Sequence, residues 1–275
     1  MERRLKGCAV DQDAGRPWEG REGGNLGRET IIKSLADALE PLDYVYAFWE
    51  GGAAAFDRAD AWSDIDLYVD ADDNRLQDVL TVVEGALTAL SGIELKYVSP
   101  TPAPHDYVHV FYRLAAADKF LLVDIAVIKH TSPDKFLEPE IHGRSRFIFN
   151  KQDVIKCPPA DREKLARDMK DALARSRTRF DLLACFIDKE LTRGNYVEAV
   201  DLYSRLVLGS LVEALRMKYD PLRYNFGPRY LRFYFPEDVV TRLVDLYFVR
   251  DGEDLRCKYE LAERWFRETV EEVDR

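Results

Sequence analysis

The chain has 275 residues, enough for two modest domains that each bury a core of their own. Apolar residues make up 47% and charged residues 33%, which is typical of a soluble globular protein. No apolar run approaches the roughly 18 residues that cross a bilayer, and the N-terminus lacks the apolar core of a signal peptide, so we expect a cytoplasmic protein. Its four cysteines are far apart and predict neither a zinc site nor a disulfide framework.

The net charge of −10 is unevenly distributed along the chain. Residues 1–155 hold 17 Lys and Arg against 27 Asp and Glu, whereas residues 156–275 hold 23 of each. Affinity for long nucleic acids comes mainly from clusters of Lys and Arg, so the acidic half argues against such a partner and favours a small molecule, for example a cationic one. The alternative is that the acidity only keeps the protein soluble.

The first predicted elements are a helix and a strand that follow a poorly ordered extension. Residues 1–26 have little periodic apolar character, which is typical of an unfolded segment. From about Glu29, apolar residues recur at helical spacing as far as Leu42, and Pro41 and Asp43 end the helix. The apolar run from Tyr44 to Trp49 then predicts a buried strand.

The next segment, GGAAAFDRADAWSDID from Gly51 to Asp66, carries recognisable chemistry. It predicts a glycine turn, a short helix and a strand on which Asp64 and Asp66 leave the same face, roughly 6 to 7 Å apart. Glycine lets a backbone approach an anion closely, and a helix N-terminus offers free N–H groups. Paired carboxylates supply the hard oxygen ligands that Mg²⁺ prefers. The alternative is a solvated strand end, where Asp is common.

The spacing of Gly51, Gly52, Ser63, Asp64 and Asp66 resembles the signature of the DNA polymerase β-like nucleotidyltransferase superfamily. The resemblance implies that the glycine turn and the helix after it hold a nucleoside triphosphate, ATP or another one, and that the two carboxylates bind Mg²⁺.

One position of the motif departs from the family, which usually has Ser where this chain has Ala53. The backbone N–H remains, but the contact from a hydroxyl to phosphate is lost. A hydrogen bond to a charged group is worth about 1.5 to 3 kcal/mol, so we expect weaker nucleotide binding. The same departure leaves open a nucleotide-binding module without catalysis.

Asp124 is predicted as the third carboxylate of the site. It interrupts the run FLLVDIAVI from Phe120 to Ile128, which has the composition of a buried strand. An isolated buried acid is costly unless it is paired or bound to metal, so Asp124 should face Asp64 and Asp66. We expect it to bind metal and to accept the proton of the attacking hydroxyl. The alternative is a structural hydrogen bond or an exposed strand edge.

The rest of the first domain is predicted to complete a sheet with flanking helices. A helix capped by Asp73 or Asn74 should end at Gly92. Strands are expected at residues 93–98, 107–114 and 120–128, the last two as an antiparallel hairpin, with a further strand at 144–149.

Two pairs of side chains near these strands have weaker claims to a role. Arg144 and Arg146 are interpreted either as phosphate contacts or as solvated edge residues. His105 and His109 would lie about 13 Å apart along a strand, too far to share an ion, and are given no role.

Beyond Pro158 and Pro159 the pattern changes to helices. They are expected at residues 161–192 and 196–219, after Pro236, and from about Glu253, which makes a bundle of four or five. The segment from Phe180 to Met217 resembles the C-terminal helical domain of the antibiotic-modifying nucleotidyltransferases, in particular the aminoglycoside and lincosamide enzymes.

The predicted fold class is therefore α+β. An N-terminal extension (1–26) precedes a nucleotidyltransferase domain (27–156) with a mixed or antiparallel sheet, and a C-terminal helical bundle (157–275) follows. The expected function is Mg²⁺-dependent transfer of a nucleoside monophosphate, with AMP from ATP as the first candidate, to a hydroxyl of a small molecule such as an aminoglycoside- or lincosamide-like antibiotic. Two Mg²⁺ ions are expected, and pyrophosphate leaves. Modification of a protein or of a tRNA end is an alternative, and monomer and homodimer both remain open.

Overall fold

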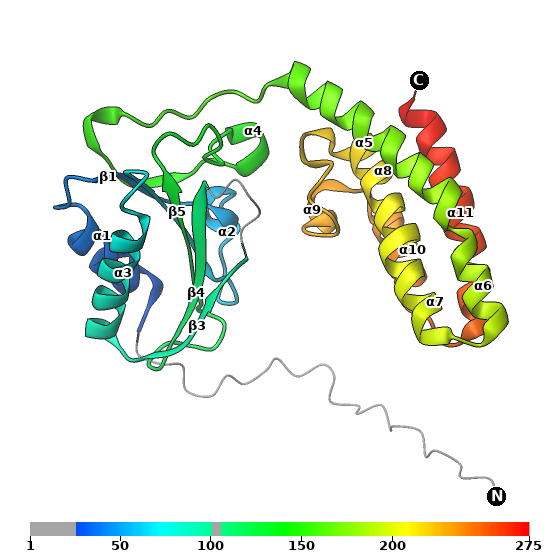
Figure 1. Cartoon of the computed structure of the whole chain (residues 1–275), viewed down its shortest axis with the longest axis horizontal. Coiled ribbons are helices and arrows are strands. Elements are labelled where there is room, and N and C mark those ends of the chain that lie inside the picture. The colour runs from blue at the N-terminus through cyan, green and yellow to red at the C-terminus, as the bar shows by residue number, and fades with distance from the viewer. Residues whose placement is uncertain (1–25, 101–105, 275) are drawn as a thin grey trace, which may run out of the picture. The chain divides into compact units, whose positions relative to one another are not determined.

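The computed structural model describes residues 26–100 and 106–274 (Figure 1). The predicted extension, except for Leu26, and His105 lie outside the described residues. The chain divides into two compact units, each treated by itself below. The first comprises Met1–Leu137 and His142–Cys157, and the second comprises Glu138–Ile141 and Pro158–Arg275.

The first unit is built on a six-stranded mixed sheet of order β3-β4-β5-β2-β1-β6. Only β2 and β5 pair in parallel, and every other neighbouring pair is antiparallel. The predicted mixed α+β architecture and the antiparallel β4–β5 hairpin are thus confirmed. The strands are β1 (Val45–Glu50), β2 (Ile65–Ala71), β3 (Ile93–Val98), β4 (Tyr107–Leu114), β5 (Val123–Lys129) and β6 (Arg146–Asn150).

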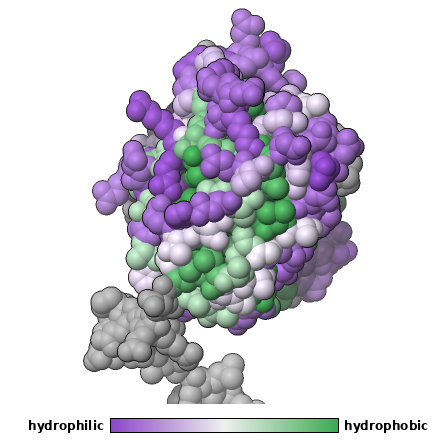
Figure 2. Space-filling view, turned by 90° about the vertical axis from the view of Figure 1, so that its left-hand side faces the viewer, coloured by the Kyte–Doolittle hydropathy of each residue, from purple (hydrophilic) through white to green (hydrophobic). Residues whose placement is uncertain are grey.

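Two helices, α1 (Arg28–Leu39) and α3 (Leu76–Leu90), lie on the same side of this sheet (Figure 1). Their apolar residues recur at helical spacing and meet the apolar positions of the strands, which alternate with period two. The main core of the unit lies between them and includes Ile31, Leu35, Val69, Val83 and Ile125. Seen from its left-hand side in Figure 1, the molecule exposes mostly hydrophilic residues with hydrophobic patches between them (Figure 2).

The opposite side of the sheet has a smaller core formed by Trp49, Ala126, Ile128, Leu137 and two further residues. Trp49 is fully buried and its ring stacks on Tyr68 with ring centroids 5.6 Å apart. The half-buried side chains of Asp66 on β2 and Asp124 on β5 lie on this side of the sheet.

Two details of the first unit differ from the prediction. Neither Asp73 nor Asn74 caps α3, because the Asp73 carboxylate accepts from the Thr131 amide at 3.1 Å instead. β5 begins at Val123 rather than at Phe120, since Leu121 and Phe120 belong to the preceding turn.

The second unit is helical and has its own core. Its elements are α5 (Arg162–Leu183), α6 (Cys185–Arg193), α7 (Tyr196–Leu202), a π-helix (Tyr203–Leu208), α8 (Gly209–Tyr219), α10 (Glu237–Tyr247) and α11 (Gly252–Val273), with short turns at Pro221–Arg223 and α9 (Leu231–Tyr234). Phe180 of α5 stacks on Phe266 of α11, with ring centroids 4.4 Å apart. The helix predicted at 161–192 is interrupted at Ala184, and the helix predicted at 196–219 contains a π-helical segment.

The short helices α2 (Gly52–Ala55) and α4 (Pro139–His142) and the 3₁₀ turn Lys151–Asp153 complete the described secondary structure. No helix within residues 26–100 and 106–274 combines the length and the apolar character that crossing a bilayer requires. Cys157, Cys185 and Cys257 are free thiols, and all three are exposed.

Candidate active site

The site begins with a tight corner between β1 and β2. After Glu50 the chain turns through Gly51 into α2 (Gly52–Ala55), and the Gly51 amide donates to the Asp66 carbonyl at 2.9 Å. Gly52 has a φ of +53°, and a Cβ on it would lie 1.7 Å from Asp66 Oδ2. Glycine is therefore required here for two reasons, a left-handed backbone and close contact with a carboxylate.

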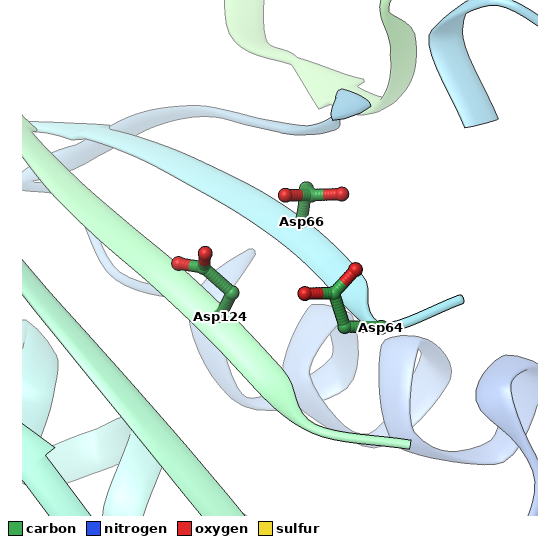
Figure 3. Close-up of side chains that lie close together, drawn as sticks. All are labelled: Asp64, Asp66 and Asp124. Atoms are coloured by element: carbon green, nitrogen blue, oxygen red, sulfur yellow. The ribbon is translucent and has the colours of Figure 1, made fainter. Parts of the chain in front are cut away.

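Asp64, Asp66 and Asp124 gather beside this corner (Figure 3). Asp64 directly precedes β2 and Asp66 lies on it, while Asp124 is the partner of Asp66 on the parallel neighbour β5. Since the strands alternate with period two, all three carboxylates leave the same side of the sheet. One oxygen from each lies within 4.8 Å of the others, an arrangement that could hold a metal ion.

The three carboxylates repel one another in a partly buried place. Burial, followed by the charge of Asp124, raises the pKa of Asp64. Burial, followed by the charges of Asp64 and Asp124, raises the pKa of Asp66 to about 7, although a hydrogen bond from the Ala53 amide and the charge of Arg28 oppose that shift. The site therefore favours either a proton or a cation between its carboxylates.

An ion-pair network centred on the buried Glu50 was not predicted from the sequence. Glu50 is 2% exposed and contacts both Arg28 Nη1 at 2.5 Å and Arg146 Nε at 2.9 Å. Arg28 Nη2 also donates to the Asp64 carbonyl at 2.5 Å. Arg28 thus fixes the backbone of a candidate ligand while its charge is neutralised by Glu50.

Arg146 belongs to this ion-pair network. Its side chain is 48% exposed on the edge strand β6, in agreement with the predicted solvated edge residue, and its guanidinium also contacts Glu50 and Glu29. The side chain of Arg144 is exposed, and its amide donates to the Ala55 carbonyl of α2 at 2.7 Å.

His109 of β4 is the second feature that the sequence analysis missed. Its Nε2 lies 2.5 Å from Asp124 Oδ1. The prediction considered only the distance along the chain to His105, whereas the partner of His109 lies across the β4–β5 pair. The alternation of β4 and the predicted hairpin were the available signals, because together they place His109 on the same side of the sheet as Asp124.

The remaining predicted residues lie around the corner with less direct contacts. Ser63 Oγ donates to Asp60 Oδ1 and accepts from the Asp60 amide, both at 3.0 Å, so its hydroxyl is engaged in a local turn. Ala53 has its amide directed at Asp66. Since α2 is one turn long, any anion would be bound here mainly by individual amides rather than by a long helix dipole.

Comparison with known proteins adds little to this description. No protein-family model matches the sequence, and no curated protein matches it. Among solved structures, the chain is similar to an aminoglycoside 6-adenyltransferase from Bacillus subtilis, at 10% identity over 90% of each chain and with a TM-score of 0.32. A TM-score this low supports no conclusion about function, so the site is interpreted from its own residues.

Proposed function

We propose that this protein is a Mg²⁺-dependent nucleotidyltransferase that moves a nucleoside monophosphate, AMP from ATP in the first instance, to a hydroxyl of a small molecule. The observation that carries the proposal is the convergence of Asp64, Asp66 and Asp124, with one oxygen from each within 4.8 Å, beside the corner at Gly52. The sequence resemblance to the polymerase β-like superfamily supports the same reaction class.

The donor set fits a hard divalent cation. Three carboxylates from two adjacent strands are the ligands that Mg²⁺ prefers, and they leave room for water and phosphate oxygens to complete its coordination. Burial, followed by the charges of Asp64 and Asp124, raises the pKa of Asp66, and a cation bound between the carboxylates would offset both causes. When bound, Mg²⁺ would supply charge stabilisation for the transferred phosphoryl group and its leaving group.

In the proposed reaction the residues of the chain bind, orient and accept a proton. Asp64, Asp66 and Asp124 would hold the cations. Gly51, Gly52 and Ala53 would bring the backbone close to the triphosphate, and Ser63 supports the turn before Asp64. The acceptor oxygen attacks the α-phosphorus, its new O–P bond forms, and the bond from the α-phosphorus to the bridging oxygen breaks, so that pyrophosphate leaves. Asp124 takes the hydroxyl proton.

The acceptor that we propose is a small, hydroxyl-bearing and preferably cationic molecule. All of the excess negative charge of the chain belongs to residues 1–155, which contain the three carboxylates. Such a field attracts cations and repels polyanions. Aminoglycoside- and lincosamide-like antibiotics satisfy this description and are the first acceptors to test, in a cytoplasmic enzyme that works as a monomer or homodimer.

The decisive experiment incubates the protein with Mg²⁺, each of the four nucleoside triphosphates in labelled form, and a panel of aminoglycosides, lincosamides, tRNA and protein extract. It measures pyrophosphate release and transfer of the label to an acceptor. The proposal expects one labelled small-molecule product and its loss in Asp66→Asn. Asp37→Asn is the matched control, because Asp37 is an exposed α1 residue paired with Lys33. A labelled tRNA or protein would instead establish the alternative acceptor class.

Ala53 favours one competing function, a nucleotide-binding module without catalysis. In that case calorimetry would detect ATP binding in the presence of Mg²⁺, while no acceptor of the panel would be labelled. Label transfer that depends on Asp66 would exclude it.

A further inference from the structure

The structure points to a role for His109 that rests on the proposed function. We propose that His109 is a positioning residue, which fixes the orientation of the Asp124 carboxylate toward Asp64 and Asp66. It is not assigned as a metal ligand, because the atoms that could hold a cation come from the three aspartates and because Mg²⁺ prefers oxygen.

The contact has a defined direction. A carboxylate can only accept, so the 2.5 Å approach of His109 Nε2 to Asp124 Oδ1 places the hydrogen on Nε2. With Oδ1 engaged from the β4 side, rotation of the carboxylate about its Cβ–Cγ bond is restricted, and its other oxygen remains for a ligand or a proton. This is the arrangement by which a hydrogen-bonded neighbour orients a metal-binding group.

The ring of His109 is itself held in place. Phe111 and Tyr107, two residues away on either side along β4, are on the same side of the sheet. Their ring centroids lie 4.5 Å and 6.5 Å from that of His109. The side chains of His109 and Asp124 are 27% and 17% exposed, so the hydrogen bond is partly shielded from water. A flanked and shielded imidazole is a rigid donor, which is what a positioning role requires.

The same sheet provides a matched comparison. His130 Nδ1 contacts Asp70 Oδ1 at 2.6 Å, but Asp70 lies four residues beyond Asp66 on β2, about 13 Å along the strand. Asp70 also contacts Lys135 Nζ at 2.5 Å and is fully buried. His130 is thus a histidine that contacts a buried acid away from the three carboxylates, and its loss should affect stability without affecting metal binding.

The test uses the full chain and Mn²⁺ as a spectroscopic probe, titrated by electron paramagnetic resonance in the presence of a non-hydrolysable ATP analogue. His109→Ala should weaken Mn²⁺ binding about 10-fold or more, the range seen when a supporting hydrogen bond to a metal ligand is lost. His109→Gln, which can return an N–H donor near the Nε2 position, should restore most of the affinity. His130→Ala should bind Mn²⁺ as the parent protein does.

Pyrophosphate release provides the second readout. His109→Ala should lower kcat about 10-fold or more with little change in the KM for ATP, because the nucleotide is bound on the other side of the carboxylates, at Gly51 and Gly52. A general loss of stability would instead reduce the active fraction and leave the Mn²⁺ affinity of the folded protein unchanged. If His109→Ala does not fold, His109→Asn replaces it, since its shorter amide cannot reach Asp124 equally well.

The failures of the two proposals are distinguishable. Parental Mn²⁺ affinity and kcat in folded His109→Ala or His109→Asn would overturn the role of His109 and leave the nucleotidyltransferase proposal intact. Both the nucleotidyltransferase proposal and the role of His109 would be overturned if the parent protein bound no Mn²⁺, or if Asp66→Asn bound Mn²⁺ as well as the parent protein does.

Discussion

The carboxylates at the two ends of strand β2 lie in opposite electrostatic environments. At the far end, Asp70 is fully buried, forms an ion pair with Lys135 and contacts His130. At the near end, Asp64 and Asp66 face Asp124, another acid, and backbone hydrogen bonds and the charge of Arg28 only partly offset the rise in their pKa values. A buried charge that is paired with an opposite charge stabilises one arrangement of the chain. A group of like charges that repel one another is instead a candidate site for a cation.

The first prediction removes one of the three neighbouring carboxylates at the near end of β2. Asp66→Asn removes a candidate metal ligand, and we expect Mg²⁺-dependent pyrophosphate release to fall at least about 1000-fold, which corresponds to roughly 4 kcal/mol of transition-state stabilisation. Thermal stability without metal should be equal or higher, because one of three repelling charges is gone. An Asp66→Asn protein with near-parental turnover would contradict the proposed function.

The second prediction removes the paired carboxylate at the far end of β2. Asp70→Asn leaves Lys135 and His130 without their carboxylate, and removing one partner of a buried ion pair typically costs about 3 to 5 kcal/mol. The free energy of unfolding, measured with urea, should fall by that amount. Metal affinity of the remaining folded protein should hold, and a protein with unchanged stability would contradict the assignment of Asp70 as a structural pair.

The third prediction concerns the corner beside the near end. Gly52→Ala introduces a Cβ 1.7 Å from Asp66 Oδ2 at a φ of +53°. Strain at a left-handed position costs about 1 to 3 kcal/mol, and the Asp66 carboxylate must also move. We expect lower stability together with lost Mn²⁺ binding. Gly85→Ala is the matched control, because a Cβ on this α3 residue meets nothing within 4 Å.

The fourth prediction uses the raised pKa of Asp66, which is about 7. Metal binding requires the ionised carboxylate, so Mn²⁺ affinity should increase about tenfold between roughly pH 6 and pH 8, with uptake of metal releasing a proton. A pH-independent affinity over this range would contradict it.

The same shift predicts how the metal-free protein responds to pH. The folded state binds the Asp66 proton more tightly than the unfolded chain does, because the pKa is about 7 in the folded state and 3.8 in the unfolded chain. The free energy of unfolding should therefore decline as pH rises from about 4 to 7. Added Mg²⁺ should offset the decline. Thermal melts with and without Mg²⁺ across this range would measure both effects.

The smallest expected effect is at Ala53. Ala53→Ser restores the hydroxyl that is usual in the family this motif resembles. One added hydrogen bond to phosphate should tighten ATP binding about tenfold, which corresponds to roughly 1.5 kcal/mol, the lower end of what such a bond contributes. Calorimetry with ATP and Mg²⁺ checks this. Unchanged affinity would mean that position 53 does not face the phosphates.

Much of the first unit could be predicted because its patterns are local. Alternation located the strands, the helical spacing of Ile31, Ile32, Leu35 and Leu39 located α1, and an acid inside the apolar run of β5 drew attention to Asp124. The break at Ala184 and the π-helical segment from Tyr203 to Leu208 were not predictable in this way, because apolar periodicity continues through both.

The sequence by itself thus determined which residue types could bind metal and that Asp64 and Asp66 share a face, since both follow from spacing along one strand. Only the tertiary structure decided that β5 lies beside β2 in the register that pairs Asp124 with Asp66, that Arg28 and Arg146 meet at Glu50, and that His109 reaches Asp124. Strand order and register depend on how the whole sheet packs against α1 and α3. The sequence separation between two residues in contact across strands varies with the loop between them, so alternation shows which side of the sheet each faces but not which partner it meets.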